Sequence, residues 1–196
     1  MLKIVLATSN SHKVEEINAI TENFGVEFVM PPKGFDPEEN GQTFEENALI
    51  KAKEANKLTN MPTLADDSGL CVDAFDGEPG IHSARYADSP KARIDKLLNE
   101  LKNIPNKKRG AKFVCAMVLL DKNGNVLFSD RGECHGKIGF KPRGINGFGY
   151  DPIFVIEGGE LTMAELPEEE KNKISHRANA LNKVINFLQS TNFITS

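Results

Sequence analysis

The longest uninterrupted apolar run in this 196-residue chain is only eight residues long, from Phe113 to Leu120. Eight residues are far fewer than the roughly 20 that a membrane-spanning helix needs, and they suit a strand that is buried in a sheet. The dipeptide Asn123-Gly124 follows and favours a hairpin turn into a second strand over 126–129. We therefore expect a fold built around a central sheet, and no membrane partner.

Helical and extended patterns alternate on either side of this hairpin. The expected strands cover 4–7, 26–30, 63–65, 70–74 and 153–156, and helices begin near His12, Thr43 and Ser89, with a closing helix through Ala178, Leu181, Ile185 and Leu188. Thr43 and Glu46 form a capping box, and Ser89-Pro90 is a good N-cap with proline in the first turn. Helices that alternate with strands, together with a hairpin, indicate an α/β fold with a mixed sheet.

Composition narrows the class of partner. The chain carries 24 Lys and Arg against 28 Asp and Glu, a net charge of −4, so no general affinity for nucleic acid is expected. Its three cysteines form no CxxC pair, and we interpret them as reduced packing residues of a cytoplasmic protein. No repeat or long linker divides the sequence, so residues 1–196 are expected to form a single domain.

A first polar cluster, Thr8-Ser9-Asn10-Ser11-His12-Lys13, lies between the first strand and the first helix. Backbone N–H groups at a helix N-terminus attract anions, and Asn10 and Lys13 add a donor and a fixed charge. The segment resembles a phosphate-binding turn but lacks the GxxxxGK[ST] pattern of a Walker loop. Ordinary helix capping is the alternative interpretation.

Acidic residues form two further clusters. Asp66-Asp67-Ser68-Gly69 follows a short strand, and adjacent carboxylates there suit Mg²⁺ that is held by one or two oxygens plus phosphate. A solvated turn is the alternative. Glu38-Glu39, in a loop rich in proline and glycine, could supply another oxygen ligand or simply face solvent.

The fourth cluster combines Gly147-Phe148-Gly149-Tyr150-Asp151 with Lys171, His176 and Arg177. An aromatic side chain between two glycines is free to present its ring to a planar ligand, and the three basic residues offer hydrogen-bond donors. A solvated, basic helix entry is the alternative. Taken together, the four clusters suit a nucleotide polyphosphate.

The chain resembles the inosine/xanthosine triphosphate pyrophosphatases, which convert deaminated purine nucleoside triphosphates to the monophosphate and pyrophosphate. The matching segments occur in family order: ATSNSHKVEEI, TFEENALIKA, LADDSGL, GEPGIHSARYA, GFGYDPIF and AELPEEEKNKISHRANAL. The resemblance implies an elongated α/β fold with a long mixed sheet, two lobes around a nucleotide-binding cleft, and a homodimer. It also implies Mg²⁺ as the cofactor and ITP, dITP or XTP as the substrate.

The resemblance also implies roles for individual residues. Asp67 is similar to the general base and a Mg²⁺ ligand, with Glu38 as the second ligand and Glu39 and Glu46 nearby. Arg85 is similar to a phosphate contact or a residue of the dimer interface. The implied substrate contacts are Thr8, Ser9, Asn10, Lys13, Ser68, Phe148, Gly149, Tyr150, Asp151, Lys171, His176 and Arg177.

Two other functions stay open at this point. One is a pyrimidine triphosphate pyrophosphatase of the sister fold family, although the SHR and GFGYD segments favour purines. The other is a non-catalytic nucleotide sensor, for which the paired carboxylates would have no use. Release of pyrophosphate from ITP with Mg²⁺ separates these alternatives.

Overall fold

The computed structural model describes residues 1–193, except for the side chain of His12. The strands are β1 (Leu2–Leu6), β2 (Val26–Val29), β3 (Thr63–Val72), β4 (Gly110–Leu120), β5 (Val126–Ile138) and β6 (Phe154–Ile156). The α-helices are α1 (Ser11–Thr21), α2 (Phe44–Thr59), α3 (Pro90–Glu100), α4 (Glu168–Ile174) and α5 (His176–Ser190). None of the helices within residues 1–193 is both long enough and apolar enough to cross a membrane.

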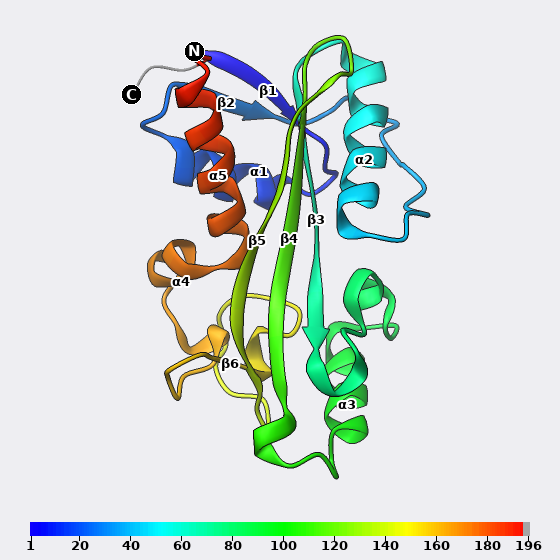
Figure 1. Ribbon diagram of the computed structural model, residues 1–196, viewed down its shortest axis with the longest axis vertical. Helices are drawn as coiled ribbons and strands as arrows, with labels where there is room; N and C mark the ends of the chain where they lie inside the picture. The colour runs from blue at the N-terminus through cyan, green and yellow to red at the C-terminus, as the bar shows by residue number, and fades with distance from the viewer. Residues whose placement is uncertain (194–196) are drawn as a thin grey trace. The chain divides into compact units, whose positions relative to one another are not determined.

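The strands form one six-stranded sheet in the order β2-β1-β3-β4-β5-β6 (Figure 1). β1 pairs in parallel with β2 and with β3, whereas β5 and β6 are antiparallel. The sheet is therefore mixed, with helices flanking it, and the α/β fold expected from the sequence is confirmed.

The chain divides into two compact units. Unit 1 comprises Met1–Asp67, Cys115–Gly132 and the chain from Ala178 onward, and unit 2 comprises Ser68–Val114 and Glu133–Arg177. β3, β4 and β5 each contribute residues to both units. Each unit has its own hydrophobic core.

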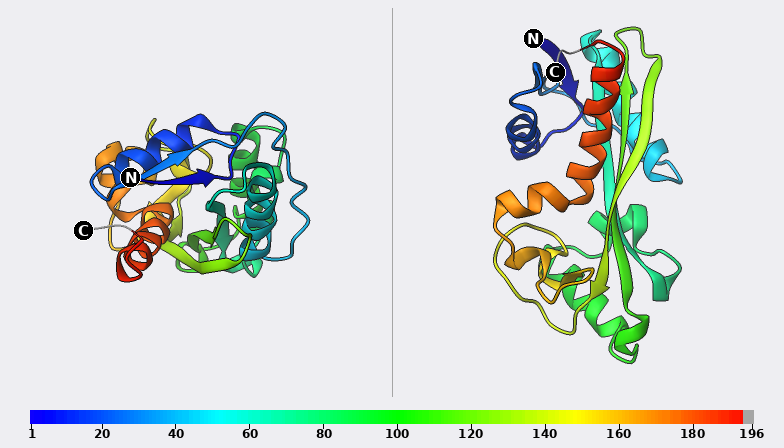
Figure 2. Two further views of the ribbon diagram at one scale, coloured as in Figure 1. Left: turned by 90° about the horizontal axis from the view of Figure 1, so that it is seen from above. Right: turned by 60° about the vertical axis from the view of Figure 1, so that its left-hand side comes forward.

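In unit 1, helices cover both faces of the sheet (Figure 2). α1 and α5 pack on one face through Ile17, Leu181 and Ile185, where Leu64 of β3 contributes to the same core. The alanine stripe of α2, Ala48, Ala52 and Ala55, packs on the other face against Ala65, Val118 and Leu120. Successive residues of a strand point to opposite faces, so the neighbours Leu64 and Ala65 serve different cores.

The core of unit 2 is formed by α3, by β6 and by the parts of β3, β4 and β5 that belong to this unit. It contains Leu70, Leu97, Phe113, Cys134 and Phe154, all buried. The start of α3 is the one expected, because the Ser89 side chain accepts a hydrogen bond from the N–H of Ala92.

The expected boundaries are wrong at the acidic segment 66–69. The sequence predicts a strand over 63–65, a turn, and a second strand over 70–74, but β3 runs unbroken from Thr63 to Val72. β1 pairs with Thr63 and Leu64 at the start of β3, β4 is its neighbour on the other side, and Asp66 is buried against Lys13, so tertiary contacts hold the polar segment extended. These long-range contacts outweigh the local preference of residues 66–69 for a turn.

Smaller differences concern the lengths of elements. β5 continues to Ile138 instead of ending near 129, because an exposed strand tolerates charged residues that look like a loop in the sequence. The basic segment before the closing helix is itself helical, as α4, and the extended Ser175 (ψ 154°) separates it from α5. Lys171 therefore belongs to α4, while His176 and Arg177 form the first turn of α5.

Candidate active site

Unit 1 holds a polar cavity of about 220 Å³ next to the end of β1. Its walls come from the β1–α1 connection, the loop after β2, helix α2 and strand β3. The polar lining residues are Thr8, Ser9, Asn10, Lys13, Asp36, Glu39, Lys51 and Asp66. The structure thus brings the first polar cluster and the acidic segment of β3 together, although more than fifty residues separate them in the sequence.

Asp66 and Asp67 have different lysine partners. The Lys13 ammonium of α1 donates to both carboxylate oxygens of Asp66 at 3.0 Å, and Asp66 is only 1% exposed. The Lys51 ammonium of α2 lies 3.2 Å from Oδ1 of Asp67. Because neighbouring strand residues point to opposite faces, each acid meets the helix that covers its own face of the sheet.

The carboxyl group of Asp67 has a pKa well above its ordinary value. Burial raises its pKa to about 6, and the nearby charges of Glu39 and Asp66 add to the rise, while Lys51 opposes it. Its Oδ2 atom is buried and has no hydrogen-bond partner within residues 1–193. A carboxylate of this kind can accept a proton near neutral pH.

Lys51 joins Asp67 to the acidic loop. Its ammonium lies 3.1 Å from Oε2 of Glu39 as well as contacting Asp67. Burial lowers the pKa of Lys51, but the carboxylates of Asp66, Asp67 and Glu39 outweigh this effect and raise it, so the ammonium stays charged. Lys51 was not among the site residues predicted from the sequence, although it lies in the segment TFEENALIKA.

Glu38 and Glu39 occupy different positions in the acidic loop. Glu38 is exposed and does not line the cavity, whereas Glu39 does and is paired with Lys51. Within residues 1–193, no group of three or more His, Cys, Asp and Glu side chains is arranged to hold a metal ion. Mg²⁺ sites, however, commonly use one or two carboxylates together with substrate phosphates, and the Oδ2 atom of Asp67 fits the first requirement.

In unit 2, a single carboxylate shapes the glycine-rich loop. Oδ2 of Asp151 accepts hydrogen bonds from the N–H of Phe148 at 2.9 Å and from the Lys171 ammonium at 2.8 Å. Gly147 has a φ of +73°, and a Cβ atom there would lie 2.1 Å from the same Asp151 oxygen. The loop therefore needs glycine at position 147, and Asp151 fixes where Phe148 projects.

Phe148 presents its ring beside two cations. The side chain is 59% exposed, the Lys171 ammonium lies 4.6 Å from the ring centroid, and the Arg177 guanidinium carbon lies 5.7 Å from it. Both cations are within the range of cation–π attraction. The exposed ring area leaves room for a planar ligand to stack.

Two further predicted residues of this cluster, His176 and Tyr150, are buried, whereas Gly149 is half-buried. His176 stacks on Phe113, with the ring centroids 4.9 Å apart and the planes inclined by 18°. Tyr150 is 4% exposed, and its hydroxyl donates to the carbonyl of Ser83 at 2.8 Å. A substrate contact of Tyr150 would therefore use its main chain, and this assignment stays a prediction.

Two predicted residues lie apart from these contacts. Ser68 is half-buried in β3 at the start of unit 2. Arg85 is exposed, and its guanidinium lies 3.5 Å from the His82 ring. Neither observation assigns a role, so the expected substrate contact of Ser68 and the phosphate or interface role of Arg85 stay predictions.

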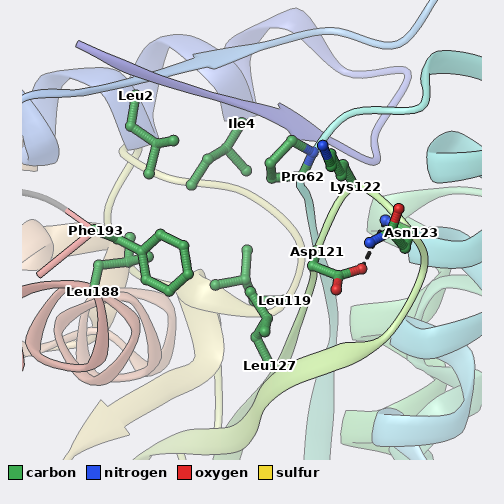
Figure 3. A pocket seen from close by; sticks show the side chains of 10 residues that line it. All are labelled: Leu2, Ile4, Pro62, Leu119, Asp121, Lys122, Asn123, Leu127, Leu188 and Phe193. Atoms are coloured by element: carbon green, nitrogen blue, oxygen red, sulfur yellow. Dashed lines mark hydrogen bonds between the residues drawn. The ribbon is translucent and has the colours of Figure 1, made fainter. Parts of the chain in front are cut away.

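A second cavity in unit 1, of about 260 Å³, is not suited to a nucleotide (Figure 3). Its walls are mostly apolar, including Leu2, Leu119, Leu127 and Leu188. The carboxylate of Asp121 at its rim is already occupied, because it accepts hydrogen bonds from the hairpin turn that follows it. Lys122 is the cation of this lining, but most of the wall is apolar, which suits a triphosphate poorly.

The chain combines a cavity lined by lysines and carboxylates with an exposed aromatic ring beside two cations. This combination is typical of proteins that bind an anionic aromatic ligand. Comparison with known proteins identifies the family within this class. The sequence profile of the Ham1 family matches residues 4–187. The chain therefore belongs to the Ham1 family.

Curated relatives and solved structures agree with this assignment. A dITP/XTP pyrophosphatase of Haemophilus ducreyi is 48% identical, covering 91% of this chain and 94% of its own. A dITP/XTP pyrophosphatase of Synechocystis is 42% identical, covering 94% of each chain. The structure of a HAM1 protein from Coxiella burnetii superposes with a TM-score of 0.88 at 41% identity, covering 97% of this chain and all of that one.

Proposed function

We propose that this protein hydrolyses deaminated purine nucleoside triphosphates, namely ITP, dITP and XTP, to the monophosphate and pyrophosphate. Family membership and the names of the relatives support this activity. The observation that carries this proposal is the carboxylate of Asp67, which lies beside the lysine-lined cavity through its contact with Lys51. Partial burial raises its pKa to about 6, and its buried Oδ2 atom has no hydrogen-bond partner among the described residues. The proposal places the enzyme in the cytoplasm, and it treats residues 1–196 as one catalytic domain.

The phosphates of the substrate would bind in the cavity of unit 1. Thr8, Ser9 and Asn10 line it next to the start of α1, where backbone N–H groups favour anions. Lys13 and Lys51 supply two positive charges there. An incoming triphosphate would compete with the carboxylates for both lysines.

Mg²⁺ is the proposed cofactor, with Asp67 as one ligand and a glutamate of the acidic loop as the other. The resemblance implies Glu38, whereas Glu39 is the glutamate that lies beside Lys51 near Asp67. When bound, Mg²⁺ would neutralise phosphate charge and favour attack at phosphorus. Titration of Mn²⁺, as a Mg²⁺ substitute, into Glu38→Gln and Glu39→Gln would show which substitution weakens metal binding.

Asp67 is the proposed general base. At neutral pH its carboxylate is mostly ionised, so it can orient a water molecule and take its proton during attack on the α-phosphorus. Lys13 would stabilise the negative charge that develops on the departing pyrophosphate. The product pair is then a nucleoside monophosphate and pyrophosphate, with no diphosphate intermediate.

The base would be read in unit 2. Phe148 would stack on the purine, and Lys171, His176 and Arg177 would supply donors toward the 6-oxygen that distinguishes hypoxanthine and xanthine from adenine. Gly149, Tyr150, Asp151 and Ser68 complete the proposed substrate contacts. A homodimer, implied by the resemblance, is also part of the proposal and is tested by light scattering.

The deciding experiment incubates the protein with ITP and Mg²⁺ and measures pyrophosphate, orthophosphate, IMP and IDP. Equal amounts of IMP and pyrophosphate, without IDP, are expected. Stepwise release of orthophosphate through IDP contradicts the proposal. A parallel panel with CTP, UTP and dUTP tests the pyrimidine alternative, and tight binding of ITP without any turnover would identify a sensor.

A further inference from the structure

A buried chain of hydrogen bonds in unit 2 connects the loop 147–151 to strand β3. It begins at Tyr150, whose hydroxyl donates to the carbonyl of Ser83 at 2.8 Å. Burial raises the pKa of Tyr150 to about 12, so the hydroxyl keeps its proton and stays a donor at any physiological pH. The contact spans 67 positions in the sequence.

Ser83 continues the chain. Its hydroxyl donates to the carbonyl of Gly80 at 2.6 Å and accepts from the N–H of Leu70 at 2.8 Å. Ser83 is 6% exposed, so water has little access to either bond. A serine hydroxyl has a single proton, which Ser83 donates to Gly80, and Ser83 also accepts a hydrogen bond from Leu70 through an oxygen lone pair.

The two ends of this chain lie next to proposed substrate contacts. Leu70 follows Ser68 by two positions and Asp67 by three in the same unbroken strand. In the sequence, Tyr150 lies between Phe148 and Asp151. The Asp151 carboxylate accepts hydrogen bonds from the N–H of Phe148 and from the Lys171 ammonium. The Tyr150 ring belongs to an apolar core that a phenylalanine would fill equally well, so packing alone does not require the hydroxyl.

We propose that Tyr150 and Ser83 are positioning residues that couple occupation of the base loop to the position of the catalytic strand. In this view, a correctly bound purine fixes the loop, and the Tyr150–Ser83–Leu70 chain sets where β3 holds Asp67. The coupling acts on turnover more than on binding, so it raises selectivity at the chemical step. This inference rests on the proposed function.

The test compares Tyr150→Phe with wild type, using Tyr86→Phe as the matched control. Tyr86 belongs to the same unit, but its hydroxyl donates to Glu100 of α3 instead of to the segment beside β3. For Tyr150→Phe we expect kcat on ITP to fall about tenfold, the scale of one lost hydrogen bond, while KM and the affinity for IMP stay within about twofold. The kcat on ATP should fall clearly less than the kcat on ITP, and Tyr86→Phe should match wild type throughout.

A second pair of variants tests the middle of the chain. Ser83→Ala should reproduce the loss of kcat, and Ser83→Thr, which keeps a hydroxyl, should restore at least part of it. Unchanged kinetics of Tyr150→Phe, a rise in KM without loss of kcat, or an equal loss on ITP and ATP with a lowered melting temperature would each overturn the coupling. If wild type releases no pyrophosphate from ITP, the proposed function fails and the coupling fails with it, whereas an active wild type with an indifferent Tyr150→Phe overturns the coupling alone.

Discussion

In unit 1, Lys13 and Lys51 line the polar cavity and meet carboxylates that point to opposite faces of β3, whereas in unit 2 Lys171 and Arg177 lie beside the ring of Phe148. The first region pairs its two lysines with carboxylates. The second region also pairs Lys171 with Asp151, but it adds an exposed aromatic ring beside its two cations. The exposed ring of Phe148 is therefore what distinguishes the second region from the first.

This difference matches two different tasks. A carboxylate whose pKa is raised by burial and partly restrained by a lysine can exchange a proton near neutral pH. A ring beside cations gains little from proton exchange, but it can stack on a base and direct donors toward its polar edge. Substitutions of Asp67 and Lys51 in unit 1 should consequently change turnover and pH dependence, while substitutions of Arg177 and Phe148 in unit 2 should change the choice and the binding of the nucleotide.

The largest effect is expected for Asp67→Asn. The amide keeps the shape but cannot accept the proton, so kcat on ITP should fall by at least about 10²-fold with little change in the ratio of activity on ITP to that on ATP. Steady-state kinetics of pyrophosphate release measure both quantities. Asp66→Asn, which alters the partner of Lys13, should reduce kcat less, and wild-type activity of Asp67→Asn would remove Asp67 as the base.

Arg177→Ala should have the next largest effect, and on selectivity. A donor facing the 6-oxygen of hypoxanthine meets an amino group in adenine, and such sites can discriminate by roughly 10⁴-fold. We expect kcat/KM on ITP and XTP to fall so that the ITP/ATP ratio narrows at least about tenfold. Lys173→Ala, an exposed neighbour paired with Glu170, is the control. An unchanged ratio of ITP to ATP activity would show that Arg177 does not recognise the 6-oxygen and would point to His176 or Lys171 instead.

Phe148→Ala should have a smaller and less selective effect. Stacking on an aromatic ring does not depend on the 6-substituent, so KM should rise about fivefold for all purine triphosphates alike, near the low end for loss of one stacked base. Phe140→Ala is the matched control, since Phe140 is another exposed phenylalanine of unit 2 and lies over Arg109. A change in KM for ITP alone would show that Phe148 takes part in reading the base.

The smallest effect concerns pH. Asp67 acts as a base only when ionised, so kcat/KM should fall as the pH drops through about 6. Lys51 lowers the pKa of Asp67 by charge and hydrogen bonding, so Lys51→Met should raise that pKa and move the acid limb of the profile to higher pH. Lys53→Met, on an exposed position of α2, should leave the limb in place. A limb that does not move would show that another group controls it.

Local signals in the sequence predicted those parts of the fold that depend on local contacts. The capping residues Thr43 and Ser89 stand at the starts of α2 and α3, as the sequence predicts. The acidic segment of β3 was misjudged because its strand conformation depends on distant partners. Asp66 and Lys13, for example, are 53 residues apart, and no local pattern reveals that pairing.

The candidate site shows the same division. The polar clusters at the ends of apolar runs were visible in the sequence, and the cavity of unit 1 gathers several of them. Lys51 and Ser83 were missed as partners, since each acts through a tertiary contact, with Asp67 and with Tyr150 respectively. Whether Glu38 or Glu39 is the second metal ligand also depends on which side chain the loop turns toward the cavity. In the structure this is Glu39, which is paired with Lys51.

Because side chains alternate between the two faces of the sheet along β3, the number of residues before Asp66 decides which face each acid points to. Inserting or deleting one residue between Thr63 and Asp66 would exchange the faces of the two acids, so that each would point at the helix that now serves the other. A two-residue change would keep the faces but move both acids about 7 Å along the strand, away from their lysines. The length of this short stretch should thus be nearly invariant in working variants, even where its apolar residues are exchanged.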